Sequence, residues 1–279
     1  MITKQEILDF SKSTGLRPEV VEKDYVLGWI LAGIHAAKPT TSHWIFKGGT
    51  CLKKCFFENY RFSEDLDFTL APSPSSTAQE LILILKSLGP WIYESSGIII
   101  PEESVEIKTN PRGTQTFIGK IGYIGPLSKQ QNGTYKIKFD FSGDEILILP
   151  TVDREILHPY SDKEACLFKT TTYAYEELFS EKIRALSERL RPRDLYDVIH
   201  LYHHRTLLPD RHTLVKTLQK KCAFKNLPFP TLKHIECHTK KEELYSEWQN
   251  MLDHQLQKLP SIDLFWGELP SLFEWLEVT

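Results

Sequence analysis

The chain has 279 residues, enough for one mixed domain with a helical companion but short for two large domains. Its composition, 41% hydrophobic and 25% charged residues with scattered glycine, is that of an ordinary globular protein and excludes disordered and fibrous classes. The formal net charge of -3 does not by itself favour a nucleic-acid partner.

The chain shows no pattern typical of a membrane anchor. Its longest apolar run, LILIL at 81–85, is far shorter than a bilayer-spanning helix. The start of the chain, MITKQEILDF, lacks the apolar stretch of a signal peptide. We therefore expect a cytoplasmic protein with no membrane partner.

The cysteines argue against a disulfide framework and a zinc ribbon, because there are five of them and no C-x-x-C pair. A metal site can be drawn from Cys222, His234, Cys237 and His238, but their spacing fits no common site. Small buried cysteines with histidines on the surface explain the pattern better.

Taken in chain order, the first predicted elements are helices at 3–13 and 18–37. Pro18 suits the first turn of the second helix, whose broad apolar stripe should pack against the body of the protein. HWIFKGG then predicts a short buried strand running into a turn, and TCLKKCFFENY predicts a helix capped by Thr50. EDLDFTL alternates apolar and polar residues, which predicts a strand with Asp65 and Asp67 on one face.

A helix is predicted near 78–94, followed by the strand-like segments VEIKT, TFIGKIGYI, YKIKFDF and EILIL. Asn132-Gly133 is a hairpin signal between the second and third of these strands. From about residue 172 the pattern is helical to the end, and the main helices are expected at 173–190, 193–204, 211–222 and 240–258. We therefore expect an α+β (α/β) fold, with a mixed sheet in residues 1–155 and a mainly helical domain in residues 156–279.

Acidic residues on two of these strands are candidates for a metal site. Asp65 and Asp67 project from one strand face and can hold a divalent cation between them. If YKIKFDF lies beside that strand, Asp140 joins them, and three such carboxylates repel one another unless cations neutralise them. Magnesium prefers oxygen ligands and is completed by substrate phosphates. The alternative is an exposed acidic pair and a solvent-facing row of Lys136, Lys138 and Asp140.

The glycine turn Gly48-Gly49-Thr50 precedes these acids in the sequence. Glycines let backbone N–H groups approach a triphosphate, and the start of the following helix favours anionic groups. Without the acids this segment would be merely a turn. Together, the turn and the acids predict a site where bound cations meet a nucleoside triphosphate.

The order of glycine turn, helix, D-x-D strand and distant third aspartate resembles the polymerase-β-type nucleotidyltransferase superfamily. A more specific resemblance, to the AbiEii/MenT family of nucleotidyltransferase toxins, is carried by five motifs in order: VEKDYVL at 21–27, FKGGTCL, RFSEDLDF, SEKIRAL at 180–186 and RPRDLYDV at 191–198. It implies a nucleotidyltransferase domain with flanking helices and a C-terminal helical domain that contributes to the active site.

The resemblance also implies roles for individual residues. Those expected to bind the triphosphate are Lys47, Gly48, Gly49, Thr50, Ser63 and Lys182. Those expected to hold Mg2+ are Asp65, Asp67 and Asp140, and catalysis would depend on these three together with Lys182 and Asp194. Asp140, or a carboxylate sharing its position, would take the proton from the acceptor.

The implied reaction is the Mg2+-dependent transfer of a nucleoside monophosphate from a nucleoside triphosphate (NTP) to an acceptor hydroxyl, releasing pyrophosphate. The implied protein is a toxin of a toxin-antitoxin or phage-defence pair, with the 3' end of a transfer RNA (tRNA) as acceptor and a cognate antitoxin as partner. Residues 182–241 hold fourteen Lys or Arg against five Asp or Glu, which is compatible with an RNA partner. A solvated helical face would have the same composition.

Other functions stay open. The same chemistry can act on a protein or a small molecule, a D-x-D sugar-nucleotide transferase would not need the glycine turn or Lys182, and a silent binding module can keep the fold. Structural explanations also exist for single residues: Lys182 as a snorkelling lysine, Asp194 as an acid at a helix start, and Arg193 with Asp197 as a surface ion pair. We expect Lys23 and Asp24 to tie the N-terminal helix to the core.

Overall fold

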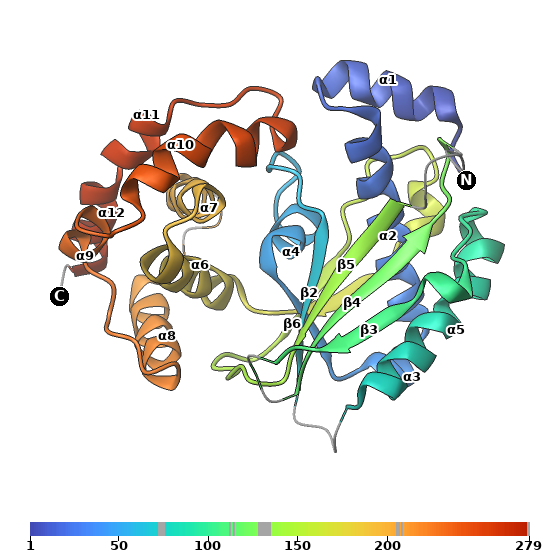
Figure 1. Cartoon of the computed structure of the whole chain (residues 1–279), viewed down its shortest axis with the longest axis horizontal. Coiled ribbons are helices and arrows are strands. Elements are labelled where there is room, and N and C mark those ends of the chain that lie inside the picture. The colour runs from blue at the N-terminus through green and yellow to red at the C-terminus, as the bar shows by residue number, and fades with distance from the viewer. Residues whose placement is uncertain are drawn as a thin grey trace. The chain divides into compact units, whose positions relative to one another are not determined.

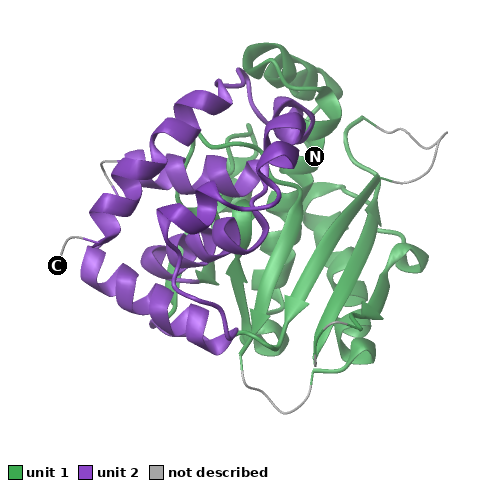
Figure 2. Cartoon of the chain, turned by 60° about the vertical axis from the view of Figure 1, so that its left-hand side comes forward, with its two compact units in different colours: residues 1–145, 151–172 green, residues 146–150, 173–279 purple. Residues whose placement is uncertain are grey.

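The computed structural model describes residues 1–71, 76–111, 113, 115–127, 135–204, 207 and 209–277. The chain divides into two compact units, Met1–Glu145 with Thr151–Thr172 and Ile146–Pro150 with Tyr173–Thr279 (Figure 2). The sequence placed the change of domain after residue 155. In the structure the chain enters the second unit at Ile146, returns to the first at Thr151, and enters the second again at Tyr173.

A mixed sheet forms the centre of the first unit (Figure 1). Its strand order over the described residues is β3-β4-β5-β2-β1-β7-β6. Strands β2 and β5 pair parallel, as do β1 and β7, and the other neighbours pair antiparallel. The bounds are β1 Trp44–Lys47, β2 Asp65–Leu70, β3 Glu106–Thr109, β4 Thr116–Tyr123, β5 Tyr135–Ser142, β6 Val152–Glu155 and β7 Lys169–Thr172.

The helices of the first unit are α1 Lys4–Thr14, α2 Pro18–Ala36, α3 Lys38–Thr41, α4 Gly48–Cys55 and α5 Ala78–Ser96. The predicted helices at 3–13, 18–37 and 78–94 are confirmed. Helix α2 is buried around most of its circumference, because it packs against α1, α5 and β7 (Figure 1). Thr77 and Glu80 form a capping box that fixes the start of α5.

The predicted strand at 64–70 is confirmed as β2, and its apolar face belongs to the core. Leu66 and Phe68 are fully buried, and the ring of Phe68 stacks on Phe141 of β5 with centroids 5.8 Å apart. The polar residues that alternate with them therefore share the other face of the sheet. The pairing of β4 with β5 agrees with a hairpin, but its turn at Asn132-Gly133 lies outside the described residues.

Helix α4 differs from its prediction. It begins at Gly48 and ends at Cys55, with Lys47 in the N-cap position, so the expectation that Thr50 caps it is wrong. Gly48 has φ +81°, which lets the chain turn from β1 into the helix two residues earlier than expected. Thr50 lies inside the first turn, and its hydroxyl donates a hydrogen bond to the backbone carbonyl of Asp65.

The strand predicted at EILIL is wrong, because its backbone bonds to side chains instead of to a neighbouring strand. The carboxylate of Glu177 accepts hydrogen bonds from the N–H groups of Ile148 and Leu149, at 2.9 and 2.8 Å. The ammonium group of Lys221 donates to the carbonyl of Ile146 at 2.6 Å. These bonds satisfy the polar groups that a sheet ladder would have paired. The short strands β6 and β7 were not predicted.

The second unit is helical, as expected for the residues after 172. Its helices are α6 Tyr175–Arg189, α7 Pro192–His203, α8 Arg211–Phe224, α9 Leu232–Glu236, α10 Lys241–Leu252, α11 Ile262–Gly267 and α12 Leu269–Glu277. The four predicted helices correspond to α6, α7, α8 and α10, although α10 ends at Leu252 instead of near residue 258. Over the described part of the chain, no helix is both long and apolar enough to cross a membrane.

Lys221 provides the first test of this fold. Its side chain and that of Glu177 are almost completely buried, and their charged groups are 2.7 Å apart. We expect Lys221→Met to destabilise the second unit by about 3–5 kcal/mol, because it leaves the carboxylate of Glu177 buried without its ammonium partner. Hydrogen exchange at the Ile148 and Leu149 amides should accelerate in parallel. Exchange at wild-type rates would contradict this account of the segment.

Candidate active site

Three acidic residues of the first unit lie on adjacent strands. In the register of β2 with β5, Asp67 is opposite Asp140, and Asp65 is opposite Lys138. Neighbouring residues of a parallel pair project from the same face, so all four side chains lie on the face opposite the buried phenylalanines. The expectation that the YKIKFDF strand lies beside the D-x-D strand is confirmed.

Lys138 is a basic residue within this group of acids. It forms an ion pair with Asp140, and both side chains are partly exposed, at 39% and 31%. Partial burial lowers the pKa of Lys138, but the hydrogen bond that it donates to Asp140 and the charges of Asp140, Asp65 and Asp67 outweigh this effect and raise the pKa above its ordinary value. The carboxylates therefore attract positive charge to this face of the sheet.

The glycine turn lies directly against these acids. A Cβ atom on Gly48 would be 2.1 Å from Oδ2 of Asp67, a distance that no substitution can accept without movement of the carboxylate or the turn. A Cβ on Gly49 would be 2.9 Å from Oγ of Ser63. Lys47 is opposite Asp67 in the register of β1 with β2. The first unit thus gathers Lys47, the turn, Ser63 and the acids into one cluster.

The residues of this cluster fit a divalent cation. Carboxylate oxygens are the hard ligands that Mg2+ prefers, and Asp65 and Asp67 offer them from one strand with Asp140 alongside. Among the described residues, no three His, Cys, Asp or Glu side chains are already placed to hold a metal ion, and the carboxylate of Asp140 is bonded to Lys138. Asp140 would have to turn away from Lys138 to become a ligand.

The second unit contains the other two predicted site residues, Lys182 and Asp194. Lys182 lies 2.7 Å from the carboxylate of Asp197, whose side chain is fully buried. Asp194, which is 1% exposed, accepts hydrogen bonds from Nε and Nη2 of Arg189, both at 2.7 Å. Asp197 is therefore not a surface residue, and its ion pair with Lys182 is a contact that the sequence did not predict.

The cysteine and histidine residues near the C-terminus form no metal site over the described residues. Cys222, His234 and His238 line one pocket of about 190 Å³, with Arg184 and Glu188. Cys237 is exposed, whereas the other four cysteines are buried, and all five are free thiols. The interpretation of small buried cysteines in this group is therefore confirmed for Cys222 and wrong for Cys237.

Comparison with known structures places the fold in a class. MenT4, a nucleotidyltransferase toxin from Mycobacterium tuberculosis, superposes with a TM-score of 0.62 at 15% identity, over 100% of this chain and 91% of that one. JHP933 from Helicobacter pylori superposes with a TM-score of 0.59 at 17% identity, over 94% of this chain and 93% of that one. The fold is therefore that of the nucleotidyltransferase toxins, an α+β fold. No curated protein matches the chain.

The family follows from the sequence model of the nucleotidyl transferase AbiEii toxin of type IV toxin-antitoxin systems, which matches residues 29–278. The chain belongs to this family and is a nucleotidyltransferase toxin. Membership implies an NTP substrate, a divalent metal and an antitoxin partner. The predicted resemblance, the fold class and the enzyme class are thereby confirmed.

Proposed function

We propose that this toxin uses Mg2+ to transfer a nucleoside monophosphate from an NTP to a hydroxyl of RNA, the 3' end of a tRNA, in the cytoplasm. The observation that carries the proposal is the approach of Gly48 to Asp67, since it brings a turn of backbone N–H groups against a carboxylate that has a second acid beside it on β5. This arrangement suits a triphosphate bound between a cationic centre and a helix start.

In this proposal the first unit binds and orients the triphosphate. Lys47, Gly48, Gly49 and Ser63 would contact its phosphate oxygens. Thr50 would act differently from the other residues of the turn, because its hydroxyl already donates to the carbonyl of Asp65 and so ties the turn to β2. Asp65 and Asp67 would hold Mg2+, which would supply positive charge to stabilise the phosphoryl group during its transfer.

The acceptor chemistry would depend on Asp140. Its carboxylate would accept the proton of the acceptor hydroxyl while the hydroxyl oxygen attacks the α-phosphorus. The bond from the α-phosphorus to the bridging oxygen of the β-phosphate then breaks, and pyrophosphate leaves. Lys182 and Asp194 of the second unit remain predicted catalytic residues. Within that unit, Asp197 forms an ion pair with the ammonium group of Lys182.

The RNA acceptor is supported by the basic surface of the second unit. Two basic residues of this segment already have acidic partners: Lys221 is buried against Glu177, and the exposed side chain of Arg189 pairs with Asp194. Other residues remain exposed, including Lys216 and Lys220 one turn apart on α8. Exposed lysines attract RNA phosphates, and their binding releases counterions from the RNA.

The experiment that tests this proposal offers the four α-labelled ribonucleoside triphosphates in turn, with Mg2+ and with tRNA, total protein or small-molecule hydroxyl compounds as acceptor. We expect label in tRNA, from one triphosphate in preference to the others. Label confined to protein or to a small molecule would overturn the RNA assignment and leave the enzyme class intact.

A pair of substitutions tests the basic surface separately. We expect Lys216→Glu with Lys220→Glu to weaken tRNA binding by about tenfold and to lower the salt dependence of binding by roughly two phosphate contacts. Lys12→Glu, an exposed lysine on α1, is the matched control and should bind like the wild type. Equal losses in both variants would show a general charge effect instead of an RNA surface on α8.

A further inference from the structure

Three consecutive charged residues of α2 hold three different segments of the first unit. The triplet is Glu22-Lys23-Asp24, from a motif that precedes the residues matched by the family model. Its bonds are Glu22 to the N–H of Leu127 at 2.6 Å, Lys23 to Glu64 at 2.8 Å, and Asp24 to Lys54 at 2.6 Å. Successive residues of a helix point about 100° apart, and a helix buried on most sides can therefore reach three segments at once.

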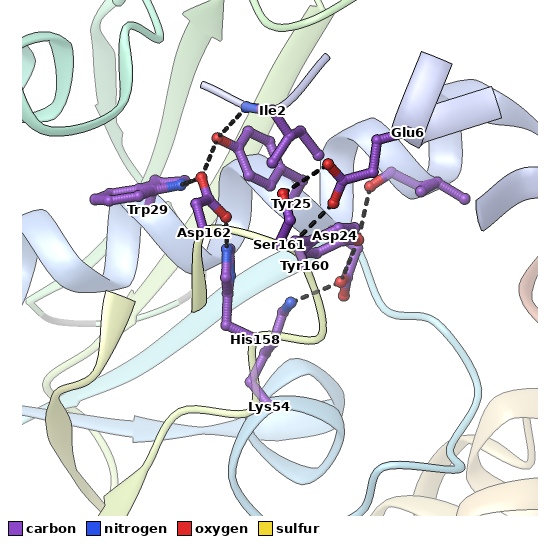
Figure 3. Close-up of polar contacts among 11 residues, drawn as sticks. Ile2, Glu6, Asp24, Tyr25, Trp29, Lys54, His158, Tyr160, Ser161 and Asp162 are labelled. Atoms are coloured by element: carbon purple, nitrogen blue, oxygen red, sulfur yellow. Dashed lines mark hydrogen bonds and ion pairs between the residues drawn. The ribbon is translucent and has the colours of Figure 1, made fainter. Parts of the chain in front are cut away.

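Two of these bonds go to the elements that build the candidate active site. Glu64 directly precedes Asp65 at the start of β2, and Lys54 lies in the last turn of α4, the helix that begins at Gly48. Figure 3 shows Lys54 reaching Asp24 from below, with Tyr160 at the same carboxylate. The side chains of Lys54 and Asp24 are 1% and 2% exposed, which makes this the more buried of the two ion pairs.

The C-terminal end of α4 is fixed by further contacts. The N–H of Leu157 donates to the carbonyl of Lys54 at 2.6 Å, and Nε of Arg154 donates to the carbonyl of Cys55 at 3.3 Å. The helix has eight residues and is therefore roughly 12 Å long. A helix this short moves as a rigid body. A displacement of its Lys54 end would therefore shift the glycine turn at its other end by a similar distance.

The ion pair gives little reason to expect a large net gain in stability. Burial raises the pKa of Asp24, but the charges of Lys54 and Lys53 and the hydrogen bonds from Lys54 and Tyr160 together outweigh it. The pKa of Asp24 therefore lies below its ordinary value of 3.8, and its carboxylate stays ionised. Oδ1 of Asp24 has no hydrogen-bond partner among the described residues, which adds to the cost of burying the charge. Buried ion pairs can often be replaced by apolar residues without loss of stability. An ion pair, however, fixes the relative orientation of the two helices that it joins more strictly than an apolar contact does.

We propose that Asp24 is a positioning residue for nucleotidyl transfer, acting through Lys54 to hold α4 so that the Gly48-Gly49 turn stays aligned with Asp65 and Asp67. This inference rests on the proposed binding of the triphosphate at that turn. It assigns to the VEKDYVL motif a function beyond tying the N-terminal helix to the core.

The test replaces the pair by apolar residues of similar volume, Asp24→Leu with Lys54→Met. Tyr160 keeps a partner in this variant, because its hydroxyl also donates to the carbonyl of Val21 at 3.1 Å. We expect thermal unfolding close to that of the wild type. Binding of α,β-methylene triphosphates of the four ribonucleosides, with Mg2+, should weaken by about tenfold, and kcat/KM should fall roughly 10²-fold.

Asp162→Asn is the matched control, because Asp162 lies outside α2 but bonds to side chains of the same helix. Asp162 accepts hydrogen bonds from Tyr25 and Trp29 of α2 and bonds His158, and none of these bonds goes to Lys54 or Asp24 (Figure 3). This substitution should lower thermal stability and leave triphosphate affinity and kcat/KM within about twofold of the wild type. A loss of affinity in the control equal to that of the double variant would overturn the positioning role.

The positioning role of Asp24 would also be wrong if the folded double variant had wild-type triphosphate affinity and turnover. If the double variant does not fold, Tyr160→Phe decides, because it removes one hydrogen bond to Asp24 and keeps both charges. We expect about threefold weaker triphosphate binding from it, and unchanged binding would reject the role. Asp67→Asn, measured in the same assay, separates the two proposals. If Asp67→Asn keeps its turnover, the proposed transfer at this site is wrong. If Asp67→Asn loses turnover while the double variant behaves like the wild type, only the positioning role of Asp24 is wrong.

Discussion

Replacement of Asp65 or Asp67 by Asn is expected to lower the rate of nucleotidyl transfer by roughly 10³-fold and to abolish toxicity. Both carboxylates lie on the polar face of β2, and Asp67 faces the glycine turn on one side and Asp140 on the other. An amide keeps the shape of the side chain but loses the charge that would hold the cation. The loss should therefore appear in turnover and not in folding.

Folding can even improve in these variants, because three carboxylates without a bound cation repel one another. Thermal unfolding without metal should accordingly stay the same or rise slightly. Glu106→Gln is the control, since this carboxylate is 45% exposed on β3 of the same sheet and pairs with Lys136. If Asp65→Asn and Asp67→Asn keep toxicity at the level of Glu106→Gln, the toxic effect does not depend on transfer at this site.

Gly48→Ala should have the next largest effect. Its Cβ would lie 2.1 Å from Oδ2 of Asp67, and the φ of +81° costs an alanine roughly 1–2 kcal/mol on its own. The turn or the carboxylate must move, and a shift of about 1 Å at a reacting centre can lower kcat/KM by roughly 10²-fold. Steady-state kinetics with the preferred triphosphate and thermal unfolding measure the two effects separately.

Gly267→Ala is the comparison for this substitution, because a Cβ there would meet nothing within 4 Å. It should leave kcat/KM and stability near those of the wild type. Gly49→Ala should be intermediate, since its Cβ would meet the ends of the Arg61 and Ser63 side chains instead of the metal-site carboxylate. Equal activity in all three variants would contradict the close approach of the turn to Asp67.

The sequence predicted the parts of the fold that follow from local periodicity. The alternation of EDLDFTL predicted β2 and the shared face of Asp65 and Asp67, and the capping pair of Thr77 and Glu80 marks the start of α5. EILIL has the same apolar content as a strand, but the buried side chains of Glu177 and Lys221 take its backbone hydrogen bonds. Such a competition between distant residues leaves no local pattern.

The candidate site was predictable to a similar extent. Its acids and glycines were found by their spacing, and the neighbouring strands confirm that Asp140 joins Asp65 and Asp67 on one sheet. The alternative of a solvent-facing row placed Lys138 and Asp140 on one face of the same strand, where they form an ion pair, but only the pairing of β5 with β2 shows that Asp65 and Asp67 share this face. Asp197 is a fully buried charged residue of α7, and no local pattern relates it to Lys182, so only the packing of α6 against α7 shows their ion pair.

Binding of Mn2+, which can replace Mg2+ at oxygen ligands, tests the central claim most directly. The free ion can be followed by electron paramagnetic resonance in the presence of an α,β-methylene triphosphate. We expect the wild type to bind Mn2+ and Asp67→Asn to bind it at least about tenfold more weakly, with the affinity of Glu106→Gln unchanged. Equal Mn2+ affinity in the wild type and Asp67→Asn would contradict a metal site on this face of the sheet.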